Sequence, residues 1–111
     1  MSRPISLDQV LDPSGGTDDE VTESVQINSG AGVLHVENQS DEGSTSVDFH
    51  LEARLSDSLG WQNWMKPYAD VPNGNGRIDP IDLRGVTRIR VRAVNQDGSN
   101  QAAVAAEFET Q

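Results

Sequence analysis

The sequence predicts an all-β domain, an antiparallel β-sandwich or jelly-roll-like fold of about six to eight strands. Three observations favour this class. Apolar and charged residues alternate without interruption over 47–55, a second alternating segment covers 88–94, and no stretch has a sustained helical period. Clusters of glycine, proline and asparagine separate the alternating segments, as is typical of strands joined by turns.

The chain length corresponds to one domain with a small core. Of the 111 residues, 34% are hydrophobic and 5% are aromatic, so oligomerisation is expected to supply additional burial. The absence of cysteine excludes disulfides and thiolate metal sites. We find no apolar run of membrane-spanning length and no signal-peptide pattern, and we therefore expect neither membrane insertion nor Sec export.

The charge balance is strongly acidic. Eighteen acids face eight bases, which gives a formal net charge of −10, and Lys66 is the only lysine. This composition favours adaptation to molar salt, where the Debye length falls to about 3 Å and hydrated carboxylates keep the surface soluble. An ordinary acidic protein is the alternative. Binding to nucleic acid is disfavoured in both cases, because phosphate contacts need clustered bases.

The organisation predicted from these patterns is an extended N-terminal arm over 1–20 followed by the β-sandwich domain over 21–111. The arm is rich in proline, glycine and acids. It also carries one apolar cluster, able to dock either on a neighbour or on the edge of its own domain. The cluster consists of Ile5, Leu7, Val10 and Leu11.

Within the domain, the pattern predicts strands over 21–27, 33–37 and 46–56. The long strand is the clearest, with its apolar set turned inward and its charged set turned outward. From 56 to 84 the sequence is interrupted by Pro67, Pro72, Gly74, Gly76 and Pro80, so we expect mostly loop there, with short pairing around 61–65.

At the C-terminal end, the pattern predicts a hairpin with Asp97-Gly98 as its two-residue turn. In that register Val91 would face Val104 and Ile89 would face Ala106. All apolar residues of both segments would then lie on one face, and a shift by one residue would place them on opposite faces.

The other face of this predicted hairpin would carry three arginines of one strand, Arg88, Arg90 and Arg92, opposite Ala103 and Ala105. One interpretation is internal pairing of the guanidinium groups with acids on the next strand. The other is an intersubunit surface, since arginine is enriched in interface hot spots. Acids dominate the N-terminal part of the chain, which also allows complementarity between copies.

The segment VTRIRVRAVNQDGS, residues 86–99, resembles the final hairpin of fibronectin type III modules, where a strand reading R-V-x-A-V-N leads into a glycine-containing turn. Thr87 stands where that family has its corner tyrosine, and the early tryptophan strand is lacking. The resemblance therefore implies sandwich-type hairpin chemistry.

A second resemblance covers most of residues 45–108. The alternating strand over 49–55, the turn SDSLGW over 56–61 and the strand RIRV over 88–91 are similar to small β-sandwich virion proteins of tailed viruses. With the acidic composition, this resemblance implies a capsid decoration protein of a virus of halophilic archaea. Such a protein would be made in the host cytoplasm and assembled into the virion. Its partners would be copies of itself and major capsid or tail proteins, without nucleic acid or membrane.

The main alternative is a fibronectin-like or carbohydrate-binding module of a haloarchaeal surface protein. Trp61 and Trp64, with Tyr68 beside them, could form a stacking platform for sugar rings, and Gln62 and Asn63 could supply hydrogen bonds. The competing interpretation is that at least one indole fills the core, because the chain has few aromatic residues.

The segment DVPNGNGRIDPIDL, residues 70–83, is similar to the calcium loop of EF-hand and dockerin modules. An inserted proline displaces the first ligand position, and the chain then continues into a strand, so a turn-rich connection is the alternative. No cofactor is required. If Ca²⁺ or another cation binds, the expected ligands are Asp70, Asn73, Asn75, Asp79 and Asp82.

Catalytic motifs are missing from the sequence. His35 and His50 both fall in predicted strands, and there is no cysteine nucleophile, Gly-x-Ser-x-Gly elbow, phosphate loop or zinc-spaced ligand set. A small core with few aromatic residues also disfavours a shaped pocket for paired carboxylates. We therefore expect a protein that is not an enzyme.

Overall fold

The computed structural model describes residues 5–11, 19–21, 24–26, 30–40, 45–97 and 99–110. Nine β-strands occur in this part of the chain. In order they are β1 (Ile5–Leu11), β2 (Asp19–Val21), β3 (Val25–Gln26), β4 (Ala31–Asn38), β5 (Ser46–Arg54), β6 (Gln62–Pro72), β7 (Gly76–Asp82), β8 (Arg88–Asn95) and β9 (Ala102–Thr110). No helix long and apolar enough to cross a membrane occurs among these residues.

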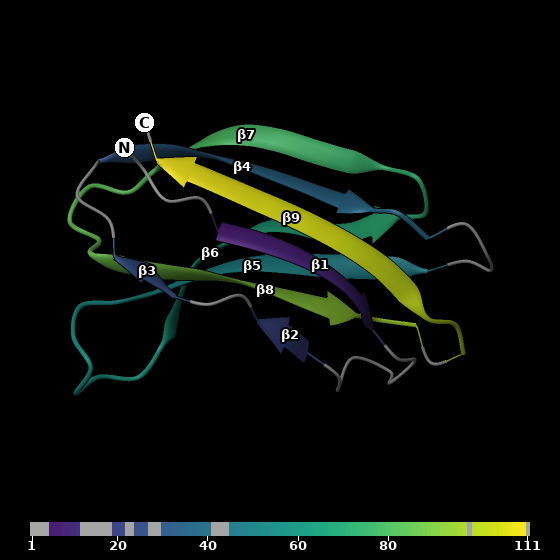
Figure 1. The fold of residues 1–111 in the computed structure, drawn as a ribbon, viewed down its shortest axis with the longest axis horizontal. Coiled ribbons are helices and arrows are strands. Elements are labelled where there is room, and N and C mark those ends of the chain that lie inside the picture. The colour runs from purple at the N-terminus through teal and green to yellow at the C-terminus, as the bar shows by residue number, and fades with distance from the viewer. Residues whose placement is uncertain are drawn as a thin grey trace.

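The strands form two antiparallel sheets, whose strands run roughly along the long axis of the molecule (Figure 1). Sheet A has the order β1-β9-β4-β7, and sheet B has the order β2-β8-β5-β6. Strand β3 also pairs with β8, so β2 and β3 share one edge and each sheet is four strand positions wide. This arrangement confirms the predicted all-β sandwich.

The strand pairs are nested, which identifies the sandwich as a jelly roll. The innermost pair is the β5–β6 hairpin, and β4–β7, β2–β8 and β1–β9 follow outward. Ile5 lies opposite Phe108, Asp19 opposite Val94 and Ala31 opposite Asp82. As the chain moves forward from β1 to β4, the residues that pair with it therefore move back by the same number of positions from β9 to β7. The chain is one long hairpin folded over itself, the topology of double-sheet jelly rolls.

The core lies between the two sheets and is built from alternate residues of each strand. Strand β4 shows this period directly, with every second residue buried. The apolar set predicted for the long strand is buried at Val47, Phe49 and Leu51, as the alternation requires. Leu55 departs from the prediction and is 64% exposed, because β5 ends at Arg54 and the chain turns away from the sheet.

The predicted C-terminal hairpin is wrong in its pairing. Strand β8 belongs to sheet B and β9 to sheet A, so Val91 pairs with Leu51 and not with Val104. The alternation of residues predicts which side chains are buried. It does not distinguish two strands paired within one sheet from two strands that face each other across a core, because the buried residues are the same in both arrangements. The crossing is held by Asn95, whose Nδ2 donates to the carbonyl oxygen of Asn100 at 3.0 Å.

The expectation of mostly loop over 56–84 is also wrong, since β6 and β7 occupy much of that segment. Both are edge strands, β6 of sheet B and β7 of sheet A. Proline is tolerated at a sheet edge because its missing N–H faces away from the ladder. The prolines therefore marked edge strands and not an irregular loop. Similarly, the strand expected over 21–27 is divided into the short β2 and β3.

The apolar cluster of the predicted arm lies on the edge of its own domain. Strand β1 pairs along its whole length with β9, and Leu11 is buried in the core. The sequence allowed this segment to dock either on a neighbour or on its own domain, and β1 docks on its own domain. Leu11 is therefore not available to a neighbour. Val10, by contrast, is exposed on the outer face. Residues 1–4 and 12–18 of the arm, and the side chains of Ile5 and Leu7, lie outside what the structure describes.

Candidate functional site

The outer face of sheet B carries the predicted arginine set. In the register of β5 and β8, Glu52 lies opposite Arg90 and His50 lies opposite Arg92. Arg90 Nε donates to Glu52 Oε1 at 2.7 Å, and an Arg92 terminal nitrogen lies 3.4 Å from Glu52 Oε2. Glu52 is only 5% exposed. One buried carboxylate therefore holds two guanidinium groups on this face.

Trp61 completes this cluster. The guanidinium carbons of Arg54 and Arg90 lie 4.5 and 4.6 Å from the centre of its ring, within cation–π range. Arg54 and Arg88 also pair with Asp57 in the β5–β6 turn. The indole is therefore part of the outer arginine cluster and not of the core. Its exposed surface is shared with charged neighbours, which argues against a free sugar-stacking face there.

Within the described part of the chain, Arg88, Arg90 and Arg92 are paired with acids of their own molecule. This is the first of the two arrangements that the sequence allowed. The acids come from β5 and the following turn, as that interpretation required. The alanines expected opposite, Ala103 and Ala105, lie on β9 of the other sheet. A role of these arginines in an intersubunit contact stays a prediction.

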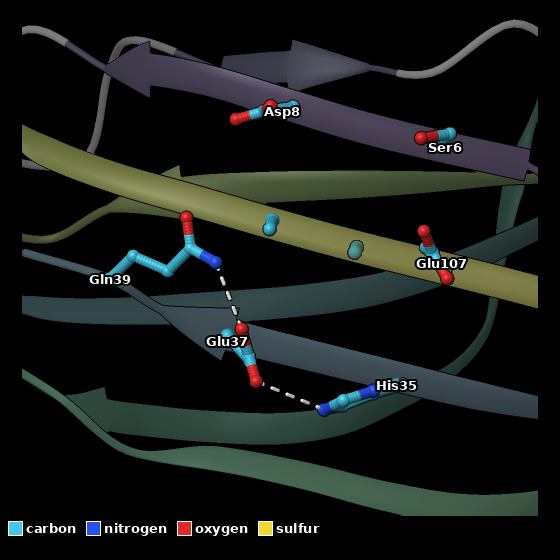
Figure 2. A pocket seen from close by; sticks show the side chains of 8 residues that line it. Ser6, Asp8, His35, Glu37, Gln39 and Glu107 are labelled. Carbon is cyan, nitrogen blue, oxygen red and sulfur yellow. Dashed lines mark hydrogen bonds and ion pairs between the residues drawn. The ribbon is translucent and has the colours of Figure 1, made fainter.

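The outer face of sheet A has a different character. A hollow of about 320 Å³ lies over three neighbouring strands, β1, β9 and β4 (Figure 2). It is lined by Ser6, Asp8, His35, Glu37, Gln39, Ala105, Ala106 and Glu107. Ala105 of β9 makes the floor low, because its outward side chain is short, whereas the side chain of Ala106 is buried in the core.

The hollow is anionic. Glu37 accepts a hydrogen bond from Gln39 Nε2 at 2.9 Å and lies 3.3 Å from His35 Nε2, and Figure 2 marks both contacts. Asp8 and Glu107 make no ion pair with another described residue. In the described part of the chain no group of three or more His, Cys, Asp or Glu side chains could hold a metal ion.

A second concavity lies at the β5–β6 end of the sandwich. It has a volume of about 460 Å³ and a mostly apolar lining. Ala53 and Val86 form its base, and the walls come from the β5–β6 turn and the start of β6. Leu55, Leu59, Gly60, Gln62, Asn63 and Trp64 contribute to these walls, with Arg54 and Gly85 at the margins. We call this concavity the end groove.

The structure divides the predicted sugar platform. Trp64 is 41% exposed in the end groove, and its Nε1 donates to the carbonyl oxygen of Asp82 at 2.9 Å. Tyr68 is buried, and its hydroxyl donates to Asp79 Oδ2 at 2.6 Å. Burial and this carboxylate raise the pKa of the Tyr68 phenol. A platform that includes Tyr68 is therefore wrong, because the bulge-containing pairing of β6 turns its ring into the core.

The structure does not bring the five predicted cation ligands together. Asp79 and Asp82 both belong to strand β7, and an odd separation along a strand places side chains on opposite faces. Asn73 Oδ1 accepts the backbone N–H of Thr45 at 2.8 Å. Asp70 lies within β6 and has a left-handed φ of 55°, and its side chain accepts a hydrogen bond from Ser46 at 3.1 Å. The segment is a crossing between sheets, and not a calcium-type loop.

Asp82 is held by a neighbouring cation. Its carboxylate accepts from Arg84 at 2.8 Å, and this hydrogen bond is the main cause that lowers the pKa of Asp82 to about 2. The same contact raises the pKa of Arg84. Asn75, the remaining predicted ligand, donates to the carbonyl oxygen of Asn73 at 3.0 Å. The side-chain oxygen atoms of Asn73, Asp79 and Asp82 thus accept hydrogen bonds from Thr45, Tyr68 and Arg84.

Sequence reasoning missed both concavities as sites. The hollow on sheet A depends on β1, β9 and β4 being neighbours, and no local pattern reports strand order. In the end groove, Gln62, Asn63 and Trp64 were recognised as one set, but Leu59 and Val86 were not. The only local signal was an apolar pair, Leu55 and Leu59, placed in a turn beside a tryptophan.

No protein-family model matches the chain, and no curated protein matches it. A solved structure of infectious bursal disease virus, Gt strain, is similar, with a TM-score of 0.48 and 14% sequence identity. The similarity covers 100% of this chain and 33% of that chain, so the protein spans about a third of the length of the chain it resembles. A likeness of this degree carries no argument about function.

Proposed function

We propose that this protein is a non-enzymatic virion structural protein, a capsid decoration protein present in multiple copies on a tailed virus of halophilic archaea. The observation that carries the proposal is the nested jelly-roll pairing of strands. Double-sheet jelly rolls serve as viral capsid domains as well as lectin domains. The net charge of −10 with a single lysine supports a protein that works in molar salt.

Exposed apolar side chains support assembly from several copies. Val10 on β1, Leu55 after β5 and Ile78 on β7 are each more than half exposed, while the core of a domain this small is limited. Isolated apolar residues on a surface are ordinary, so the argument depends on Val10. It stands beside the anionic hollow on β1, the strand that ends sheet A in the described part of the chain, where we propose that a partner strand approaches.

The two outer faces support partners of opposite character. The arginines of sheet B keep 26–32% of their side-chain surface exposed while paired with acids, which leaves them able to contact an acidic neighbour. On sheet A, Asp8 and Glu107 face the hollow and make no ion pair with another described residue. In this proposal the edge at β1 and the arginine face contact copies of the protein and the major capsid or tail proteins.

The test is the solution mass by light scattering at ~2–3 M KCl and at ~0.15 M KCl, the screened and unscreened regimes. A discrete oligomer whose mass depends on salt is the expected result, and a monomer in both salts would contradict the proposal. Val10→Glu should dissociate the oligomer. Ile78→Glu is the matched control, since Val10 is 58% and Ile78 is 63% exposed on opposite edges of sheet A.

The alternative, a binding module of a haloarchaeal surface protein, keeps one specific observation in its favour. Lectin domains share the jelly-roll architecture, and Trp64 is exposed in a concavity. A stable monomer at both salt concentrations that binds a saccharide would favour this alternative over the virion protein.

A further inference from the structure

We infer that the end groove binds a carbohydrate, with one pyranose ring stacked on Trp64. This inference goes beyond the proposed structural role and does not depend on it, since a decoration protein and a surface module could each use such a site. It differs from the platform predicted from sequence in its members: Trp61 and Tyr68 are outside it, and the walls come from the β5–β6 turn.

The shape of the groove suits a small ligand. Its volume of about 460 Å³ falls within the range of ligand sites, about 300–1,000 Å³. Val86 and Ala53 close the base against the core, and Leu55 and Leu59 stand on the turn. Figure 1 shows this turn as the teal loop that projects from the body at the lower left. The walls are therefore supplied by a projecting segment, and the base by the sheets.

Trp64 is held in a fixed position. Its Nε1–H is committed to the carbonyl oxygen of Asp82 across the open edge of the sandwich, so the indole is anchored at one end while the rest of the ring remains partly exposed. The carbon-bound hydrogens of a pyranose form an apolar face that packs on an aromatic ring. A prearranged indole binds such a face without a further cost for ordering the side chain.

The polar groups of the groove favour a neutral ligand. The charges at its margins are already paired, Arg54 with Asp57 at 3.2 Å and Arg84 with Asp82 at 2.8 Å. The carboxamides of Gln62 and Asn63 are exposed and make no hydrogen bond with another described residue. Each carboxamide offers both a donor and an acceptor, which is what sugar hydroxyls require.

The mouth of the groove is open. A Cβ atom added at Gly60 or Gly85 would meet nothing within 4 Å, so both positions border free space. An extended saccharide can therefore continue out of the groove on either side of the ring that is bound. These features together select a neutral, hydroxyl-rich ligand with one apolar face, and not a charged or purely aliphatic one.

The experiment is a titration of the full chain with cellotetraose, maltotetraose and chitotriose. Binding is followed by the NMR signal of the Trp64 indole N–H and, in every variant including Trp64→Ala, by the backbone amide signals of Gly60 and Gly85, which line the groove. Trp64→Phe assigns the indole signal, because the chain has two tryptophans. We expect saturable shifts with at least one saccharide and a Kd on the order of 1 mM. Trp64→Ala should weaken binding by roughly two- to tenfold, the range that aromatic contacts of roughly 0.5–1.5 kcal/mol give.

Matched variants separate loss of the site from loss of the fold. Met65→Ala removes another partly exposed side chain of the same strand outside the groove and should leave the Kd unchanged. Gln62→Ala with Asn63→Ala keeps Trp64 and should weaken binding several-fold, because each hydrogen bond contributes roughly 0.5–1.5 kcal/mol. Amide dispersion verifies that each variant is folded.

Two results would overturn the inference. One is the absence of a saturable shift at ~10 mM of all three saccharides, tenfold above the expected Kd. The other is binding that is equally strong in folded Trp64→Ala or in the Gln62→Ala, Asn63→Ala double variant. Neither result bears on the oligomer mass, so the virion proposal and this inference succeed or fail separately.

Discussion

Both outer faces of the sandwich carry charged side chains at alternate strand positions, but these charges are paired and partly covered on sheet B and largely exposed on sheet A. On sheet B, Glu52 is buried beneath Arg90 and Arg92, and Trp61 lies against two guanidinium groups. On sheet A, Glu37 is 43% exposed beside His35, and Asp8 and Glu107 face the hollow without an ion pair to a described residue. The outer face of sheet B is stabilised by ion pairs between its own charged side chains, whereas the acidic side chains on the outer face of sheet A are exposed.

This difference shows that an outward position on a strand does not by itself mean contact with water. Arginine is long enough to lie over the neighbouring strand and cover the acid there. The sheet A face lacks such residues among its described strands, and alanine on β9 leaves its acids uncovered. Stability should therefore depend on the charges of sheet B, and solubility and partner choice on those of sheet A.

The largest expected effect comes from Glu52→Ala. Removing this carboxylate leaves two partly buried guanidinium groups without their shared partner, which should lower the free energy of unfolding by about 2 kcal/mol, a value reduced for the partial exposure of the arginines. Glu37→Ala on sheet A is the control and should change it by less than about 0.5 kcal/mol. Urea unfolding of both variants measures the difference, and equal losses would remove the distinction between the faces.

Tyr68 tests the edge where the two sheets meet. Its hydroxyl on β6 donates to Asp79 on β7, and its pKa is raised above the ordinary value of 10.0. The neutral phenol therefore stabilises the fold fully below pH 10, and this contribution is lost as the pH rises further. Tyr68 is the only tyrosine, so ultraviolet absorbance of tyrosinate follows it alone.

In that titration the folded protein should resist ionisation of Tyr68 near pH 10, and Tyr68→Phe should lose about 1 kcal/mol of stability at neutral pH. The stability of the variant should then fall less above pH 10 than that of the unchanged protein. Ionisation at the ordinary pKa, with the protein still folded, would show that the ring is not enclosed between the sheets.

The smallest effect is expected on sheet A. Asp8→Asn with Glu107→Gln removes like charges from the hollow and should raise the free energy of unfolding by up to about 0.5 kcal/mol at low salt. The gain should disappear at ~1 M KCl, where the Debye length is about 3 Å. Thermal unfolding at both salts measures this. A loss of stability at low salt would mean that these acids have partners on their own molecule.

The sequence predicted burial better than it predicted pairing. The alternation over 47–55 identified Val47, Phe49 and Leu51 as core residues, and the C-terminal alternation identified Ile89 and Val91. It failed at Leu55, where the strand had already ended. The assignment of Val104 as a partner of Val91 failed for a different reason, because strands that face each other across a core show the same pattern as a hairpin.

The candidate site was predicted only in part. Trp64 with Gln62 and Asn63 follows from local sequence, since consecutive residues remain neighbours in any fold. Tyr68 was placed with them, but irregular pairing between β5 and β6 turns its ring inward. Val86 reaches the groove only because the β7–β8 connection ends beside β5, a contact made by segments far apart in the chain.

By itself, then, the sequence determined the strand period, the buried face of the long strands, the acidic surface and the all-β class. These depend on side-chain polarity and near-neighbour geometry, which the sequence carries directly. The tertiary structure decided the strand order, the crossings between sheets and the covering of Glu52 by arginine. Backbone hydrogen bonds between strands are chemically alike for every partner, so only the packing of the whole chain selects which strands become neighbours.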